Sequence, residues 1–292
     1  MRSANRLARV LAAGLLCVGL GSTHAGLPQH LAWVVQAEQP VTWRAMPVTG
    51  GTGAQGSMMY PAPNLAGFLV AIATHAALQK GADEAERRSR ESAADALLLP
   101  YQPVVSAWRL DRLARAALPH LSAPVSTEVV DPFAPTPGWV VRSTPIFRLE
   151  PLERVVVLDN AVTVLDPAGG RTLFEGVVRV IGQPQMAPSP QATWLESDGL
   201  ALQTEAARLL AHSVEVALLA TQRAAPAPAD FRTQRFQFAG DVKVERAATV
   251  ASLCDRQVMV TLRDTWLSAP RLSADKPPEG CAATLRQALA AQ

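Results

Sequence analysis

Hydrophobic and polar positions repeat with different periods along the chain, and each period predicts an element. A short apolar run at 31–36 predicts a strand. An alternating segment at 40–48 contains two prolines, which predicts an edge strand or an extended segment. The next pattern is an apolar stretch followed by a charged one, which predicts a long helix over 65–99. A proline-initiated helix is expected over 103–118.

The strongest strand pattern lies in the second half of the chain. A strand is expected at 139–143, and two long runs rich in valine at 154–165 and 171–181 flank a turn sequence with proline and two glycines. Proline early and glycine late in such a connection are typical of a turn, so these runs predict a long hairpin.

A stripe of leucine, alanine and valine at helical spacing follows this hairpin and predicts a helix over 200–222, with Ser197 or Asp198 as its N-cap. Short strand patterns near 236–245 then lead into a second long hairpin. Its arms are expected at 247–254 and 257–267.

The order of these elements predicts an α+β fold: a mixed, mainly antiparallel sheet with two long hairpins and helices packed on one face. We divide the chain into a signal peptide (1–25), a strand and two-helix segment (26–130) and a hairpin–helix–hairpin segment (131–292), the last two forming one compact unit. Over residues 30–220 the element order is similar to that of small α/β modules of envelope proteins such as the TolB amino-terminal and CsgG-like families. No diagnostic motif of either family matches, so the resemblance assigns no residue a role.

The first 25 residues have the pattern of a secretory signal peptide. Three arginines precede an apolar stretch at 10–20 that is too short to span a bilayer. Cleavage is expected near Ala25–Gly26, with export to the periplasm or beyond, and we expect no transmembrane segment in the mature chain. Leu16 in front of Cys17 does not fit a lipoprotein site, so a lipid anchor is not expected.

Composition supports a folded, exported protein. Of 292 residues, 49% are hydrophobic and 18% charged, which is enough apolar material for a core. Cleavage would remove three arginines and no acid, leaving 24 basic residues against 25 acidic ones. This balance gives no electrostatic case for nucleic acid as the partner.

Two cysteines remain after cleavage, Cys254 and Cys281. In an oxidising compartment such a pair predicts a disulfide, worth ~3.5 kcal/mol by the chain-entropy estimate. It would pin a C-terminal helix over 281–291 to the second hairpin.

Motifs for chemistry are sparse, and no catalytic residue is assigned. A glycine-rich match at 51–56 is followed by prolines where a dinucleotide site needs a helix, so it predicts a flexible loop and no cofactor. The mature histidines, His30, His75, His120 and His212, lack the close spacing of a metal site, so no metal is expected.

The weak functional candidates are His75, His212 and Glu215. His75 is expected to be a core or interface histidine. His212 and Glu215 share one side of the 200–222 helix and are interpreted as a surface pair rather than a proton relay, whereas adjacent His212 and Ser213 point in different directions. Asp159 precedes an asparagine and is interpreted as a turn or cap residue.

The predicted helix at 65–78 is apolar round its whole circumference. One face would cover the sheet, and the second would meet either the 103–118 helix or a partner, including a second copy of the chain. The candidate interface residues are Phe68, Leu69, Ile72, Ala73 and Ala76.

These patterns favour a non-catalytic interaction or assembly component of the bacterial cell envelope. The alternative is a periplasmic protein that binds or hydrolyses a small molecule at a site assembled from residues far apart in the sequence.

Overall fold

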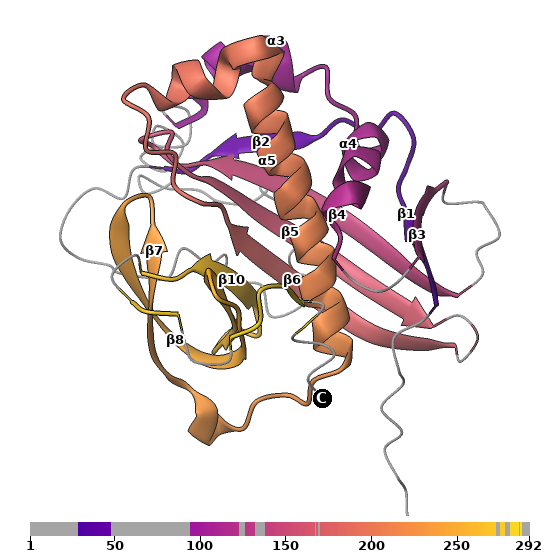
Figure 1. Ribbon diagram of the computed structural model, residues 1–292. Helices are drawn as coiled ribbons and strands as arrows, with labels where there is room; N and C mark the ends of the chain where they lie inside the picture. The colour runs from indigo at the N-terminus through magenta and orange to yellow at the C-terminus, as the bar shows by residue number, and fades with distance from the viewer. Residues whose placement is uncertain are drawn as a thin grey trace, which may run out of the picture.

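The fold is built on one mixed sheet with helices on one face. The computed structural model describes residues 29–47, 94–122, 126–131, 138–166, 168, 170–272, 275–277, 281–285 and 287. The strand order is β3-β1-β4-β5-β6-β10-β9-β8-β7, and β2 pairs with β4 beside this path. Most pairings are antiparallel, and helix α5 crosses the sheet (Figure 1). The predicted α+β class is therefore confirmed.

The N-terminal strands add to one side of the sheet in parallel. β1 (His30–Val34) lies between β3 (Ser126–Val130) and β4 (Trp139–Leu149), and β2 (Thr42–Ala45) runs along the far half of β4. The strands expected near 31–36 and 40–48 are thus confirmed. Strand β3 was not predicted, because this five-residue edge strand has no fully buried side chain to give it a pattern.

The predicted central hairpin is confirmed as β5 (Val156–Asp166) and β6 (Arg171–Ile181). Alternate residues of β5 enter two different hydrophobic cores, because successive side chains of a strand point to opposite faces. Leu158 packs in the core beneath the helices, whereas Val157 packs in the core of the C-terminal strands. Burial on both faces explains the nearly continuous apolar sequence.

Helix α5 (Pro190–Thr221) begins ten residues before the predicted start, but it is broken between Glu196 and Gly199. Ser197 and Asp198, the predicted caps, both have positive φ at this break. The second part therefore begins where the sequence predicted the helix. The first part is anchored by Trp194, whose Nε1 donates to the carbonyl oxygen of Glu153 at 2.6 Å.

The helix predicted over 103–118 is wrong as one continuous element. It is interrupted between α3 (Gln102–Val105), which follows the 3-10 turn η1 (Leu99–Tyr101), and α4 (Leu110–Ala117), which continues into η2 (Leu118–His120). The amide of Val41 donates to the carbonyl of Trp108, and the amide of Leu110 donates to that of Gln39. These bonds to the segment before β2 hold Arg109, the residue before α4, in an extended conformation, and α4 then packs against α5.

The C-terminal strands curl away from the central hairpin (Figure 1). They are β7 (Arg232–Phe238), β8 (Asp241–Ser252), β9 (Arg256–Thr261) and β10 (Trp266–Pro270), and β10 returns to pair in parallel with β6. The single arm predicted over 257–267 is therefore wrong. It is two strands joined by a turn in which Asp264 has positive φ and the Thr261 hydroxyl accepts two backbone amides.

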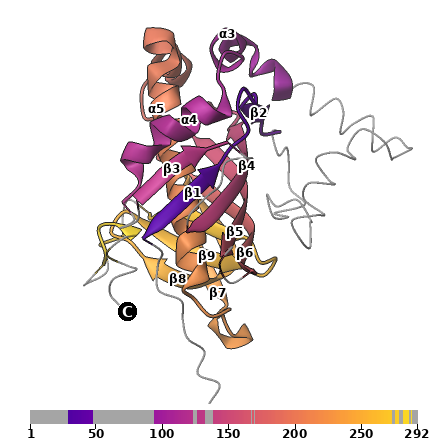
Figure 2. The same ribbon diagram turned by 90° about the vertical axis from the view of Figure 1, so that its right-hand side faces the viewer.

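The sheet thus has two distinct ends. Figure 2 looks toward β1 and β3, and β7 and β8 form the opposite end of the strand order. The larger core lies between the sheet and α3, α4 and α5, while the smaller one lies inside the curl of β7–β10.

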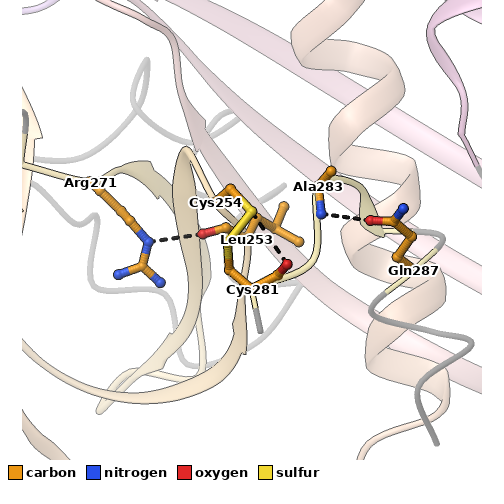
Figure 3. The surroundings of a disulfide bond; sticks show 6 residues. All are labelled: Leu253, Cys254, Arg271, Cys281, Ala283 and Gln287. Atoms are coloured by element: carbon orange, nitrogen blue, oxygen red, sulfur yellow. Dashed lines mark hydrogen bonds between the residues drawn. A yellow bond between two sulfur atoms is a disulfide. The ribbon is translucent and has the colours of Figure 1, made fainter. Parts of the chain in front are cut away.

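The predicted disulfide is confirmed between Cys254 and Cys281, whose Cα atoms are 5.1 Å apart (Figure 3). The helix predicted from Cys281 is wrong in its first residues, since 281–284 are not helical. Ala282 instead forms a β-bridge with Leu253, and its carbonyl accepts the amide of Cys254. The helical residues described here are Leu285 and Gln287.

Several predictions fall outside the described residues. These are the signal peptide, the glycine-rich segment at 51–56, the helix over 65–78 with its candidate interface, and His75. Where the structure is described, the helices lack the combination of length and apolar character that a membrane span requires.

Candidate functional site

The candidate residues His212 and Glu215 meet a serine and an arginine from distant strands. The Nε2 atom of His212 lies 2.8 Å from the Ser268 hydroxyl of β10, and its Nδ1 lies 3.6 Å from Oε2 of Glu215. Arg256 of β9 donates from Nη1 to the same hydroxyl at 3.2 Å. Residues 56 positions apart thus form one polar cluster, which we call the His212 cluster (His212, Glu215, Arg256 and Ser268).

This cluster is internal, so the interpretation of His212 and Glu215 as a surface pair is wrong. The His212 side chain is 13% exposed, Glu215 is buried, and Ser268 is 0% exposed. Glu215 also accepts from the amide and the hydroxyl of Ser122, which closes over it from the segment after η2. The helical pattern gave the direction of the two side chains but not the chain segments that cover them.

The electrostatics of the cluster hold His212 neutral. Burial and the charge of Arg256 lower the pKa of His212 to about 4, against the opposing effect of Glu215. Burial and the nearby Arg208 lower the pKa of Arg256 to about 10, so Arg256 stays charged at neutral pH. The Ser268 hydroxyl oxygen accepts from Arg256 and lies within hydrogen-bond distance of Nε2 of His212, while Nδ1 of His212 faces Glu215.

This order of groups is that of a serine nucleophile, a histidine base and an orienting carboxylate. Nucleophilic chemistry also requires an acyl group to reach the serine oxygen and donors to meet the oxyanion. Ser268 is fully buried in the sheet, and the cavity found beside β7 is lined by other residues. In this arrangement the cluster joins α5 to β9 and β10.

The neighbouring Ser213 points to a different element, as predicted. Its hydroxyl accepts from Nδ2 of Asn160 on β5 at 2.8 Å and donates to the carbonyl of Leu210. Adjacent residues of α5 therefore bind two different parts of the sheet, Ser213 at β5 and His212 at β10.

A second buried charge cluster lies on the opposite face of the sheet. Asp159 of β5 accepts from Arg148 at 2.8 Å and from Arg179 at 2.5 Å. Burial alone would raise the pKa of Asp159, but the two guanidinium groups outweigh it and hold this pKa below its ordinary value. The interpretation of Asp159 as a turn or cap residue is wrong, because it lies in the middle of a strand.

Sequence reasoning missed Ser268, Arg256 and the partners of Asp159. Ser268 lies one residue beyond the predicted hairpin arm, and no local pattern marks it. His30 and His120 are exposed. Among the residues described, no three His, Cys, Asp or Glu side chains are grouped as metal ligands.

No protein-family model, curated protein or solved structure matches the chain.

Proposed function

We propose that this chain is an exported interaction or assembly component of the bacterial cell envelope, which acts by holding a protein partner. The observation that carries the proposal is the outward face of the β7–β8 hairpin, at the end of the sheet. There Val242 and Val244 are 47% and 60% exposed. They are two residues apart on one strand, so they share a face.

Arginines accompany these valines. Val244 is paired with Arg235, and the next outward position of β8 is Arg246, both exposed. The acidic residues of β8, Asp241 and Glu245, alternate with the valines and lie on the other face. The outward face, consisting of Arg235, Val242, Val244 and Arg246, is therefore apolar and basic.

Such a surface suits a protein partner with apolar contacts and an acidic rim. Arginine is enriched at interfaces, and charge complementarity directs association. Export is supported by the Cys254–Cys281 disulfide, a bond typical of oxidising compartments. The signal peptide and periplasmic location remain part of the proposal.

The test is capture of partners from an envelope extract by the mature protein and two charge variants. Val244→Glu places an acid on the proposed face, and Leu262→Glu places the same charge at another exposed apolar position, in the β9–β10 turn. The proposal expects an acidic protein that wild type and Leu262→Glu both retain and Val244→Glu loses. If all three retain the same proteins in equal amounts, the hairpin is not the docking surface.

A second candidate function is hydrolysis, favoured by the order of groups in the His212 cluster. A fluorophosphonate probe labels serines activated by a neighbouring base. A hydrolase would be labelled at Ser268, with labelling lost in Ser268→Ala and His212→Gln. The interaction proposal expects no labelling of Ser268 in folded wild type, and stoichiometric labelling there would overturn it.

A further inference from the structure

A cavity of about 300 Å³ lies where the connection after β6 meets the β7–β8 turn and the segment after β10. Its lining residues are Gln183, Pro184, Met186, Gln237, Gly240 and Arg271. The described lining combines two amides and a guanidinium with the apolar Pro184 and Met186, and none of these described residues is an acid. The volume is at the lower end of the range for small-molecule sites.

Arg271 is held in place but is incompletely satisfied. Its Nε donates to the carbonyl of Leu253 at 2.9 Å, as Figure 3 shows, and its backbone amide donates to the carbonyl of Asp255. Its Nη2 atom is buried and has no hydrogen-bond partner among the residues that the structure describes. Buried donors in proteins are nearly always paired, so this guanidinium retains a donor group that a further acceptor could use. The adjacent Cys254–Cys281 disulfide helps to fix the Leu253 carbonyl that orients it.

A second cation, Arg154, lies near the lining residue Gly240 without being part of the lining itself. The Nη1 atom of Arg154 lies 3.6 Å from the position that a Cβ atom on Gly240 would occupy. Gly240 has a φ of +94°, a conformation that favours glycine, and its missing side chain leaves this wall open toward Arg154. Asp241 follows Gly240 but does not line the cavity.

At the mouth, Met186 is 74% exposed, and Val242 of the outward hairpin face pairs with the lining residue Gln237. The charged part of the cavity therefore continues into exposed apolar surface. A ligand with an anionic head and an apolar body would complement both parts.

From these observations we infer that the cavity binds an organic carboxylate, with the acid group on the guanidinium of Arg271 and the apolar body over Met186. A guanidinium matches the planar carboxylate and binds it by charge-assisted hydrogen bonds. This chemistry is shared by free aliphatic acids and by the C-terminal carboxylate of a peptide. The cavity adjoins the proposed docking face at Val242, but its lining residues lie outside that face, and the inference does not depend on which protein binds there.

The experiment titrates octanoate, and an acetylated dileucine with a free carboxyl end, into the mature disulfide-bonded protein by calorimetry. Octanol and the amidated dileucine are the uncharged controls. We expect at least one acid to bind and its uncharged counterpart to bind at least tenfold more weakly. Octanoate alone would identify a site for free acids, and the peptide alone would identify a site for chain ends.

Three variants locate the binding. Arg271→Gln removes the guanidinium, and Met186→Glu places an acid at the mouth through an exposed residue that folding does not require. Each is expected to weaken binding of the acid at least tenfold, whereas Leu262→Glu, which adds the same charge outside the lining, is expected to leave it within twofold. The inference is overturned if neither acid binds at concentrations on the order of 10 mM, where even millimolar affinity is detected. It is also overturned if Met186→Glu and Leu262→Glu behave alike.

Discussion

His212 provides the sharpest test of the buried polar cluster, because its protonation should control stability at acidic pH. The ordinary pKa of histidine is near 6.5, and in the folded protein burial and Arg256 lower the pKa of His212 to about 4. Between these values the unfolded chain binds a proton that the folded chain does not. Stability therefore falls as the pH falls from about 6.5 to about 4.

The size of this effect follows from the two pKa values. Integrating the proton linkage from pH 7 to pH 4 gives a loss of about 3 kcal/mol from this one histidine. The side chain is only 13% exposed, so solvent screening reduces the figure little. This loss is a substantial fraction of the 5–15 kcal/mol stability of typical domains, ~0.1 kcal/mol per residue.

The perturbation is His212→Gln, which has no proton to gain and keeps an amide oxygen that can accept from Ser268. Urea unfolding of the disulfide-bonded protein would be followed by circular dichroism at pH 7, 6, 5 and 4. The variant is expected to be less stable than wild type at pH 7 and to approach or pass it by pH 4. His120→Gln, which alters an exposed histidine of η2, is the matched control and should follow the wild-type curve.

Two results would refute this reasoning. Parallel curves for wild type and His212→Gln would mean that His212 has the same pKa in the folded and unfolded chains. A wild type that gains stability relative to the variant on acidification would mean that His212 is a protonated partner of Glu215. In that case the pKa would be raised rather than lowered, and the sign of the linkage would reverse.

Three further predictions concern structural constraints. Cys281→Ser should lower the free energy of unfolding by ~3.5 kcal/mol relative to the protein joined at Cys254, measured by urea unfolding. Gly199→Ala should lower the free energy of unfolding by at least about 1 kcal/mol, because φ is +77° and the new Cβ would lie 2.4 Å from Cγ1 of Val104. In thermal melting, adding Val104→Ala should restore part of the lost stability. Equal melting temperatures of wild type and Gly199→Ala would contradict the strain. Asp159→Asn should cost ~3–5 kcal/mol by leaving buried guanidinium charge uncompensated, and a loss under 1 kcal/mol in urea unfolding would mean that the ion cluster is dispensable.

The sequence predicted those elements whose patterns are local. The central hairpin was found because both arms are long, rich in valine and joined by a proline–glycine turn. The second part of α5 was found because its leucines and alanines repeat at helical spacing. The disulfide followed from cysteine count and compartment.

The errors lie where distant residues compete with local preference. Trp108 and Leu110 were assigned to one helix, but backbone bonds to the segment before β2 interrupt it. The turn between β9 and β10 contains Asp264 with positive φ in a run that reads as continuous strand.

For the candidate site, helical geometry placed His212 beside Glu215 and apart from Ser213, and the structure agrees on both directions. Helical geometry could not identify Ser268 as a partner of His212, because the contact between α5 and β10 depends on the parallel pairing of β10 with β6. Helical geometry also could not predict that Glu215 is buried, since Ser122, from a segment 93 residues away, covers it.

The polar contacts of α5 fix the rotation of the helix over the sheet, which its apolar residues leave undetermined. Residues 213–220 are all buried, so this part of the helix is enclosed round its whole circumference. Leucine and alanine on every side would allow several rotations of the helix over the sheet, because apolar contacts are not directional. Ser213 bound to Asn160 and His212 bound to Ser268 are directional, and together they match one rotation only. A rotation of one residue would leave both buried hydrogen bonds unmade, at about 1–3 kcal/mol for each orphaned group. Together, the Ser213–Asn160 bond and the His212 cluster thus fix the rotation of α5 against both the central hairpin and the C-terminal strands that carry the proposed docking face.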